Sequence, residues 1–222
     1  MKKLLLPILC CLFAVASCTL GGSYSATNMK DLVTMDQGRL VNDYGVTYTI
    51  SEISGQDLPT LVEGQRYYAV FDILNEQLEI VLKHALPTKI VTPIPAPDNV
   101  EEIAEKDPVE FQFDVPGNKY RDLGIVYYKN PKSDFVHDVT VYYRLEDAGA
   151  TLHLYVFHEG NNENPAFMES KDLIKDFMVI SVPISSFSNV NSHLLTWDLL
   201  VQDMTTKEYS VVRRTQEINR NY

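Results

Sequence analysis

Apolar and polar positions alternate over much of the first hundred residues, and this alternation predicts β-strands. In GVTYTISE (45–52) every second position is apolar, a period of two that is typical of a half-buried strand. The same period returns in QRYYAVFDIL (65–74) and in QLEIVLKHAL (77–86), and turn-forming residues separate the three runs. We therefore expect residues 36–93 to form a small five-stranded barrel of the OB type.

A second set of alternating runs follows Pro108, and it predicts an antiparallel β-sandwich over residues 109–215. Six or seven short strands joined by turns are expected there, with one helical segment near 166–177 and a polar tail at 216–222. In the first of these strands, alternation places four apolar residues on one face: Val109, Phe111, Phe113 and Val115. The chain as a whole is predicted to be all-β, with an OB-like barrel followed by the sandwich.

Residues 94–108 interrupt the strand pattern and are predicted to be a linker. Prolines at alternate positions from Pro93 to Pro97 favour an extended, semi-rigid spacer, and an acidic stretch follows them. A proline-edged loop inside a single domain is the alternative interpretation of the same residues.

The N-terminus has the pattern of a secretory signal. Two lysines precede an apolar run of thirteen residues, 4–16, which is shorter than the roughly 20 residues that a membrane-spanning helix needs. The residues Val15, Ala16, Ser17 and Cys18 resemble a bacterial lipobox, and this resemblance implies cleavage after residue 17 and lipid on the Cys18 sulfur. An ordinary secretory cleavage site with an incidental cysteine is the alternative.

Lipid on Cys18 would anchor the protein to a membrane, and residues 18–35 would then carry the anchor and a tether. The stretch TLGGSYSATN after Cys18 is small and polar, as flexible tethers are. The residue after the cysteine is Thr19 and not aspartate, which by resemblance to the lipoprotein sorting rule points to the bacterial outer membrane. The sequence leaves open which face of that membrane the protein occupies.

The charge of the chain makes nucleic acid an improbable partner. The formal net charge is −11, and it becomes −13 when Lys2 and Lys3 leave with the signal. A negative field of this size repels phosphate backbones. We therefore expect no nucleic-acid binding.

Three stretches of the first domain resemble the NigD-like family of bacterial lipoproteins. They are GRLVNDYGVTYTI (38–50), LVEGQRYYAVFDIL (61–74) and ALPTKIV (85–91). The resemblance implies an N-terminal OB-like domain, a C-terminal β-sandwich without cysteines, and a place in the cell envelope. The family takes its name from a bacteriocin-associated gene cluster, so an immunity or accessory role is one function that the resemblance implies.

The sequence carries no recognisable catalytic motif, and we expect a protein that is not an enzyme and has no cofactor. The five histidines are scattered and are interpreted as solvated or capping residues. The loop HEGNNENP (158–165) gathers oxygen donors, but its spacing is not that of an EF-hand, so no metal site is assigned. A polysaccharide hydrolase with an unrecognised carboxylate pair is the enzymatic alternative.

Three tyrosine pairs lie within predicted strands, and alternation turns one member of each pair outward. We expect Tyr68, Tyr128 and Tyr142 to be the outward members. Exposed tyrosines offer rigid, amphipathic area for a protein or sugar partner, although β-propensity alone also explains tyrosine in strands. These observations predict a binding or assembly module for an envelope protein or glycan.

Overall fold

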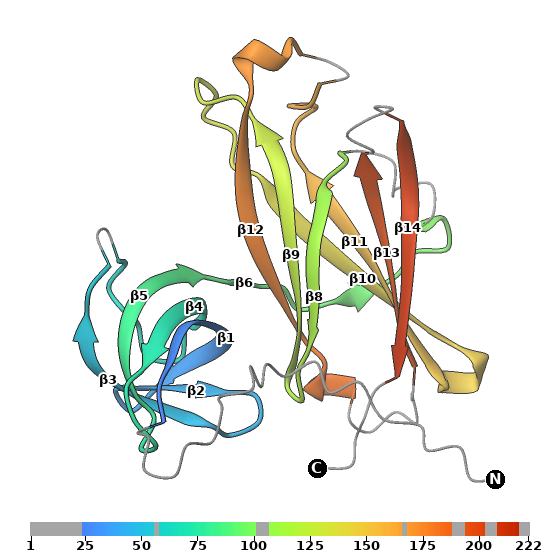
Figure 1. Cartoon of the computed structure of the whole chain (residues 1–222). Coiled ribbons are helices and arrows are strands. Elements are labelled where there is room, and N and C mark those ends of the chain that lie inside the picture. The colour runs from blue at the N-terminus through green and yellow to red at the C-terminus, as the bar shows by residue number, and fades with distance from the viewer. Residues whose placement is uncertain are drawn as a thin grey trace, which may run out of the picture.

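The computed structural model describes residues 24–55, 58–100, 107–165, 168–187, 194–202 and 208–217. Cys18, the signal and the first part of the tether lie outside these described residues. Within them, strands form two units that lie side by side, a barrel and a larger sandwich (Figure 1). The described residues contain no helix that is both long enough and apolar enough to cross a membrane.

The first unit is a closed five-stranded barrel, as predicted, but its first strand begins at Ala26, within residues 18–35 that were assigned above to the tether. Its strands are β1 (Ala26–Asp36), β2 (Arg39–Asn42), β3 (Thr47–Ile53), β4 (Arg66–Ile73) and β5 (Glu79–Pro87), closed in the order β1-β2-β3-β5-β4. Alternate residues of β4 and β5 fill the barrel, among them Tyr67, Phe71, Ile80 and Leu82, each at most 1% exposed. Because closure pairs every strand on both sides, the barrel leaves no open sheet edge.

The second unit is a sandwich of two sheets. One sheet has the order β6 (Lys89–Ile90), β12 (Ile174–Pro183), β9 (Tyr120–Lys129), β8 (Glu110–Pro116). The other has the order β14 (Tyr209–Glu217), β13 (Leu194–Gln202), β11 (Thr151–Glu159), β10 (Asp138–Glu146), β7 (Ile94–Pro95). Short 3-10 turns lie at Asp147–Gly149, Ser170–Asp172 and Ser185–Phe187. Most neighbours are antiparallel, but β11 and β13 are parallel because β12, which separates them in the chain, belongs to the opposite sheet.

The chain between the barrel and β8 is bound to the sandwich. β6 pairs with β12 in one sheet, and β7 pairs with β10 in the other. After β7, Val100 is fully buried and packs on Tyr155 and Phe157, on the outer face of the second sheet. The first residues of the segment assigned above to a linker therefore cover part of the sandwich.

The expected helical segment near 166–177 is wrong for the residues described there. A single 3-10 turn at Ser170–Asp172 is followed by β12, which starts at Ile174 and pairs with β9 over ten residues. Backbone pairing with a neighbouring strand has overridden whatever local helical preference the segment carries.

Candidate functional site

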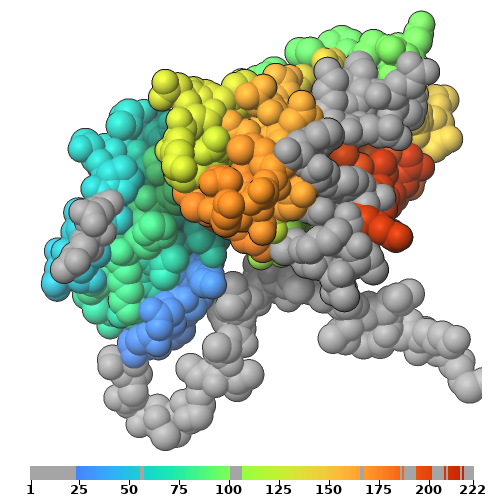
Figure 2. Space-filling model, turned by 90° about the horizontal axis from the view of Figure 1, so that it is seen from above, coloured from blue at the N-terminus to red at the C-terminus, as the bar shows by residue number. Residues whose placement is uncertain are grey.

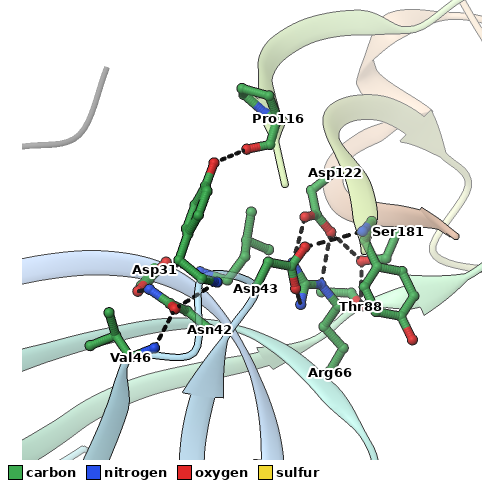
Figure 3. A network of polar contacts seen from close by, with 12 residues as sticks. Asp31, Asn42, Asp43, Val46, Arg66, Thr88, Pro116, Asp122 and Ser181 are labelled. Atoms are coloured by element: carbon green, nitrogen blue, oxygen red, sulfur yellow. Dashed lines mark hydrogen bonds and ion pairs between the residues drawn. The ribbon is translucent and has the colours of Figure 1, made fainter. Parts of the chain in front are cut away.

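A buried arginine joins the two units. Arg66 begins β4 of the barrel, and its side chain crosses to the sandwich and is 1% exposed. Its Nε and Nη2 donate hydrogen bonds to the two carboxylate oxygens of Asp122 in β9, at 3.0 and 2.6 Å, and its Nη1 donates to Asp43 at 2.7 Å. Figure 3 shows the guanidinium held between the two carboxylates. Both acidic side chains are at most 4% exposed, so the three charges form one buried network.

Hydroxyl and backbone groups complete this network. Ser181 of β12 donates a hydrogen bond of 2.5 Å to Asp122 and lies 2.8 Å from the hydroxyl of Thr88, which follows the barrel (Figure 3). The second oxygen of Asp43 accepts the backbone N–H of Tyr120 at 3.1 Å, and the Tyr120 ring lies under the Arg66 guanidinium. Every charged group is therefore bonded within the contact between the units.

The electrostatics of Arg66 favour its charged form. Burial acts to lower the pKa of the guanidinium, but the hydrogen bonds and charges of Asp122 and Asp43 outweigh that effect, and the pKa is raised. An arginine that stays charged while fully buried requires both of its carboxylate partners in place. We call Arg66, Asp43 and Asp122 the interdomain lock.

An aromatic contact lies beside the lock and depends on a β-bulge. In β8, Phe111 pairs with Ile125 and Phe113 pairs with Gly124, so Gln112 is an extra residue. The bulge turns Phe113 away from the face that Phe111 shares with the sandwich core. The Phe113 ring stacks on Tyr68 of the barrel, with ring centres 5.5 Å apart. The expectation that Val109, Phe111, Phe113 and Val115 share one face is therefore wrong.

Gly124 makes room for the displaced ring. A Cβ at this position would lie 2.6 to 2.8 Å from three atoms of Phe113, closer than side chains tolerate. Phe177 of β12 adds a third ring, 6.1 Å from Phe113 and 6.3 Å from Tyr68. The barrel and the sandwich are thus joined by the buried polar network and by the aromatic contact, and the Tyr44 hydroxyl adds a hydrogen bond of 2.7 Å to the Pro116 carbonyl of β8 (Figure 3).

A second polar cluster lies at the other end of the sandwich. Its members are His137, which precedes β10, His158 of β11, and Glu163 of the β11–β12 loop, and each is at most 7% exposed. His137 Nε2 lies 3.1 Å from a Glu163 oxygen, and His137 Nδ1 lies 3.1 Å from His158 Nε2. If His137 Nε2–H donates a hydrogen bond to Glu163, then Nδ1 of the same neutral ring can only accept, and it accepts the hydrogen bond that His158 Nε2–H donates. Nδ1 of His158 then has no hydrogen-bond partner among the described residues.

Burial governs the protonation of this cluster. It lowers the pKa of His158 to about 4, and the neighbouring His137 acts in the same direction. Burial acts to raise the pKa of Glu163, but hydrogen bonds from Ser133, Asn130 and His137 outweigh it, and the pKa is lowered. Near neutral pH, Glu163 is therefore a carboxylate and His158 a neutral imidazole. We call these three residues the His–His–Glu cluster.

The His–His–Glu cluster supports the β9–β10 loop, residues 130–137. Glu163 accepts the backbone N–H of Asn130 at 2.6 Å, at the start of the loop, and His137 closes its end. Between them the loop presents Phe135 and Val136, which are 39% and 79% exposed. Figure 2 views this end of the molecule and shows residues 125–140, in yellow-green, beside the orange residues that precede β12.

A third charged group lies on the outer face of the second sheet. Asp198 of β13 accepts two hydrogen bonds from Arg213 of β14, at 2.8 and 2.7 Å, and also lies 3.2 Å from His153 Nε2. The other ring nitrogen of His153 lies 3.0 Å from Glu146. This alternation of acid and base tethers β10, β11, β13 and β14 to one another.

The three predicted tyrosines lie on three different sheets and do not form one surface. Tyr68 is half-buried in the aromatic contact between the units. Tyr128 of β9 is half-buried and lies under the Lys175 ammonium, 5.5 Å from its ring centre. Tyr142 of β10 is half-buried and contacts Phe157 on the outer face of the second sheet. Cys18, the lipidation residue expected from the sequence, lies outside the described residues.

The expectation of solvated histidines is wrong for three of them. His137, His153 and His158 are buried and bonded to other ionisable groups, while His84 is exposed. A signal for one of them was present, because His158 continues the inward alternation of Leu152, Leu154 and Val156 in the same strand. Glu163, one of the oxygen donors of loop 158–165, points into the molecule and binds a histidine.

Comparisons with solved structures show that the fold of this chain occurs in other proteins. A protein of unknown function from Bacteroides vulgatus superposes with a TM-score of 0.59 at 15% identity, covering 85% of this chain and 91% of that chain. A NigD-like immunity protein from Bacteroides caccae gives 0.58 at 14% identity, covering 86% and 93%. A candidate lipoprotein from Bacteroides fragilis gives 0.56 at 14% identity, covering 89% and 99%.

Identities of 14 to 15% show a common fold. The expected all-β architecture of a barrel followed by a sandwich is confirmed, and so is the resemblance to NigD-like proteins at the level of fold. The sequence matches no model of a known family, and it matches none of the curated proteins.

Proposed function

We propose that this protein is a lipid-anchored binding module of the bacterial cell envelope, which holds another envelope protein and does not transform a substrate. The observation that carries the proposal is the buried contact between its two units. The interdomain lock and the Tyr68–Phe113 stack hold the barrel against the sandwich, and we infer that the two units move as one body.

The barrel lies close to the expected membrane anchor, and the far end of the sandwich is available to a partner. Cys18 precedes the first barrel strand by eight residues, so a lipid there would hold Ala26 within about 27 Å of the membrane surface. The β9–β10 loop follows Lys129, seven residues beyond Asp122 of the lock, which is about 23 Å along the strand. The exposed pair Phe135 and Val136 therefore lies away from the anchored barrel, where a partner could reach it.

The chemistry of the buried groups supports binding more than catalysis. In the interdomain lock each charge is bonded to an opposite charge, and in the His–His–Glu cluster the carboxylate supports a loop. A general base needs a path to the proton that it removes. Here the imidazoles and carboxylates of the two networks are nearly covered.

The envelope location of the proposal rests on the lipobox residues and on the likeness to the Bacteroides fragilis candidate lipoprotein. The outer membrane is the proposed location because Thr19 follows the anchor cysteine. Replacing Cys18 by serine should release the protein from membranes into the soluble fraction of a cell lysate. If the C18S variant still sediments with membranes, the anchor is not the Cys18 lipid.

The partner is tested by substitution of the exposed loop. The full chain would be inserted into lipid vesicles and exposed to detergent-solubilised envelope extract, and retained proteins would be identified. Val136→Asp should abolish retention of a specific envelope protein, because it places a charge in the apolar contact. Val62→Asp is the matched control, since Val62 is 56% exposed but belongs to the barrel. Equal retention by both variants and the original chain would remove the loop from the proposal.

An immunity role beside a secreted toxin is the second candidate, favoured by the fold shared with the NigD-like immunity protein. In that case the partner that this protein binds is a toxin. Deletion of the gene should sensitise the cell to toxin produced by its neighbours, and unchanged survival in mixed culture would count against this role.

A further inference from the structure

The sandwich has one long, regular strand at an open sheet edge. Among the described strands, β14 pairs only with β13, over nine residues and without a register shift. The edge strands β6 and β7 are two residues long. Proteins usually protect long edges, because unpaired backbone groups there accept further strands.

The other edge strand, β8, carries such protection and β14 does not. β8 contains a bulge at Gln112, ends in Pro116, and turns the charged side chain of Asp114 inward. Each of these features discourages the addition of another strand. The contrast between the two edges of the same sandwich marks β14 as the edge that stays available.

The side of the sandwich between β8 and β14 is incompletely closed. A small opening there is lined by Phe111, Asp114, Trp197, Val212 and Arg214, together with two leucines. Trp197 is 2% exposed, and its Nε1 has no hydrogen-bond partner among the described residues. The Asp114 carboxylate, 5% exposed, has an ion pair with Arg121 but no hydrogen bond that the described residues provide. The indole N–H and the carboxylate therefore have hydrogen-bonding capacity that the described residues do not use.

The charged side chains of β14 determine which kind of strand could pair with it. Arg213 and Arg214 are adjacent in β14 but have different partners. Arg213 is held by Asp198 of the same sheet, whereas the Arg214 guanidinium lies over the Phe111 ring at the opening, 4.5 Å from the ring centre. Full antiparallel pairing of two copies, centred on Arg213, would place the two Arg214 side chains on one face as diagonal neighbours. Like charges at neighbouring positions of a strand pair destabilise it, whereas opposite charges stabilise it. The edge therefore disfavours a second copy and favours an acidic strand.

We propose that β14 accepts an extended, acidic segment of a partner protein as an additional strand of the second sheet. Such a segment would lie across the opening, with its backbone paired to β14 and alternate side chains directed towards Phe111 and Trp197. Strand addition of this kind obtains affinity from main-chain hydrogen bonds and specificity from alternate side chains. The inference rests on the proposed binding role but uses a different surface from the β9–β10 loop.

The probe is a synthetic nine-residue peptide in which glutamate alternates with valine, compared with one in which lysine replaces glutamate. Each peptide would be added at millimolar concentration to the full chain in detergent micelles, and backbone amide hydrogen exchange would be measured by mass spectrometry. The acidic peptide should slow exchange in residues 209–217 and should bind at least about threefold more tightly than the basic peptide. Exchange in loop 130–137 should not change.

Arg214→Glu should reverse the preference between the two peptides, an effect that mere loss of structure cannot produce. Lys132→Glu is the control, because the Lys132 side chain is 82% exposed and lies on the β9–β10 loop, away from β14, and it should leave the preference unchanged. The proposal is overturned if neither peptide protects β14, if protection falls on β8, or if β14 is protected by self-association without peptide. Retention of an envelope protein through Val136 would survive each of those results, so the two proposals fail separately.

Discussion

Replacement of Arg66 by methionine should destabilise the protein by about 3 to 5 kcal/mol, the usual cost of removing one partner from a buried ion pair. Methionine resembles arginine in length but leaves Asp43 and Asp122 buried without their counter-charge. Because domains of this size are stable by about 5 to 15 kcal/mol, the loss is a large part of the total.

A double substitution distinguishes two causes of the lost stability: the carboxylate left without its counter-charge, and the packing lost with the arginine side chain. Arg66→Met combined with Asp122→Leu removes both members of the bidentate pair, and Asp43 keeps its hydrogen bond from the Tyr120 backbone. Hydrophobic replacement of a buried pair is often nearly neutral. The part of the loss that comes from the orphaned Asp122 should therefore return, while the part that comes from Asp43, still buried without Arg66, should remain. Lys171→Met is the control, because the Lys171–Glu169 pair is about three-quarters exposed and should contribute below about 1 kcal/mol.

Urea unfolding followed by two signals tests both the stability and the coupling of the units. The chain has a single tryptophan, Trp197, buried in the sandwich, so its fluorescence reports that unit, while far-ultraviolet circular dichroism reports both. The two curves should coincide in the original protein and separate in the Arg66→Met variant. A loss no larger than that of Lys171→Met, with coincident curves, would refute the role given to the lock.

Two further predictions concern the His–His–Glu cluster and the aromatic contact. His158 titrates near pH 4 when folded and near 6.5 when unfolded, so the unfolded state binds its proton first as the pH falls. The free energy of unfolding should therefore decrease by about 3 kcal/mol from pH 6.5 to pH 4. His158→Gln should make this pH dependence shallower, as measured by the urea midpoint at each pH. An equally steep dependence in the variant would show that other groups cause it. Gly124→Ala should cost about 1 to 3 kcal/mol by forcing the Phe113 ring off Tyr68, and Phe113→Leu in the same chain should recover part of that loss in thermal unfolding. Equal melting temperatures for Gly124→Ala and the original protein would contradict the tight approach of Gly124 to the ring.

The sequence by itself determined many of the strands, because a strand with one buried face must alternate, and that alternation is local. It missed β1, which lies almost wholly within residues 18–35 that were assigned to the tether, and the start of β12. β3, β4 and β5 lie where the period of two placed them. In β4, Tyr67 is buried and Tyr68 faces away from the barrel core, as the apolar register required. The absence of cysteine after Cys18 was likewise readable without a structure.

Only the tertiary structure decided what covers the outward faces. Arg66 shares the outward side of β4 with Tyr68, and its partner Asp122 lies 56 residues further along the chain. No local pattern can show that these two side chains meet, since each reads alone as a solvated charge on a half-buried strand. The bulge at Gln112 is equally invisible, because one unpaired residue reverses Phe113 without changing the sequence alternation. The outward faces of β4 and β9 form the contact between the two units. Whether such a face is buried depends on a second unit that packs against it, and the strand pattern does not encode that packing.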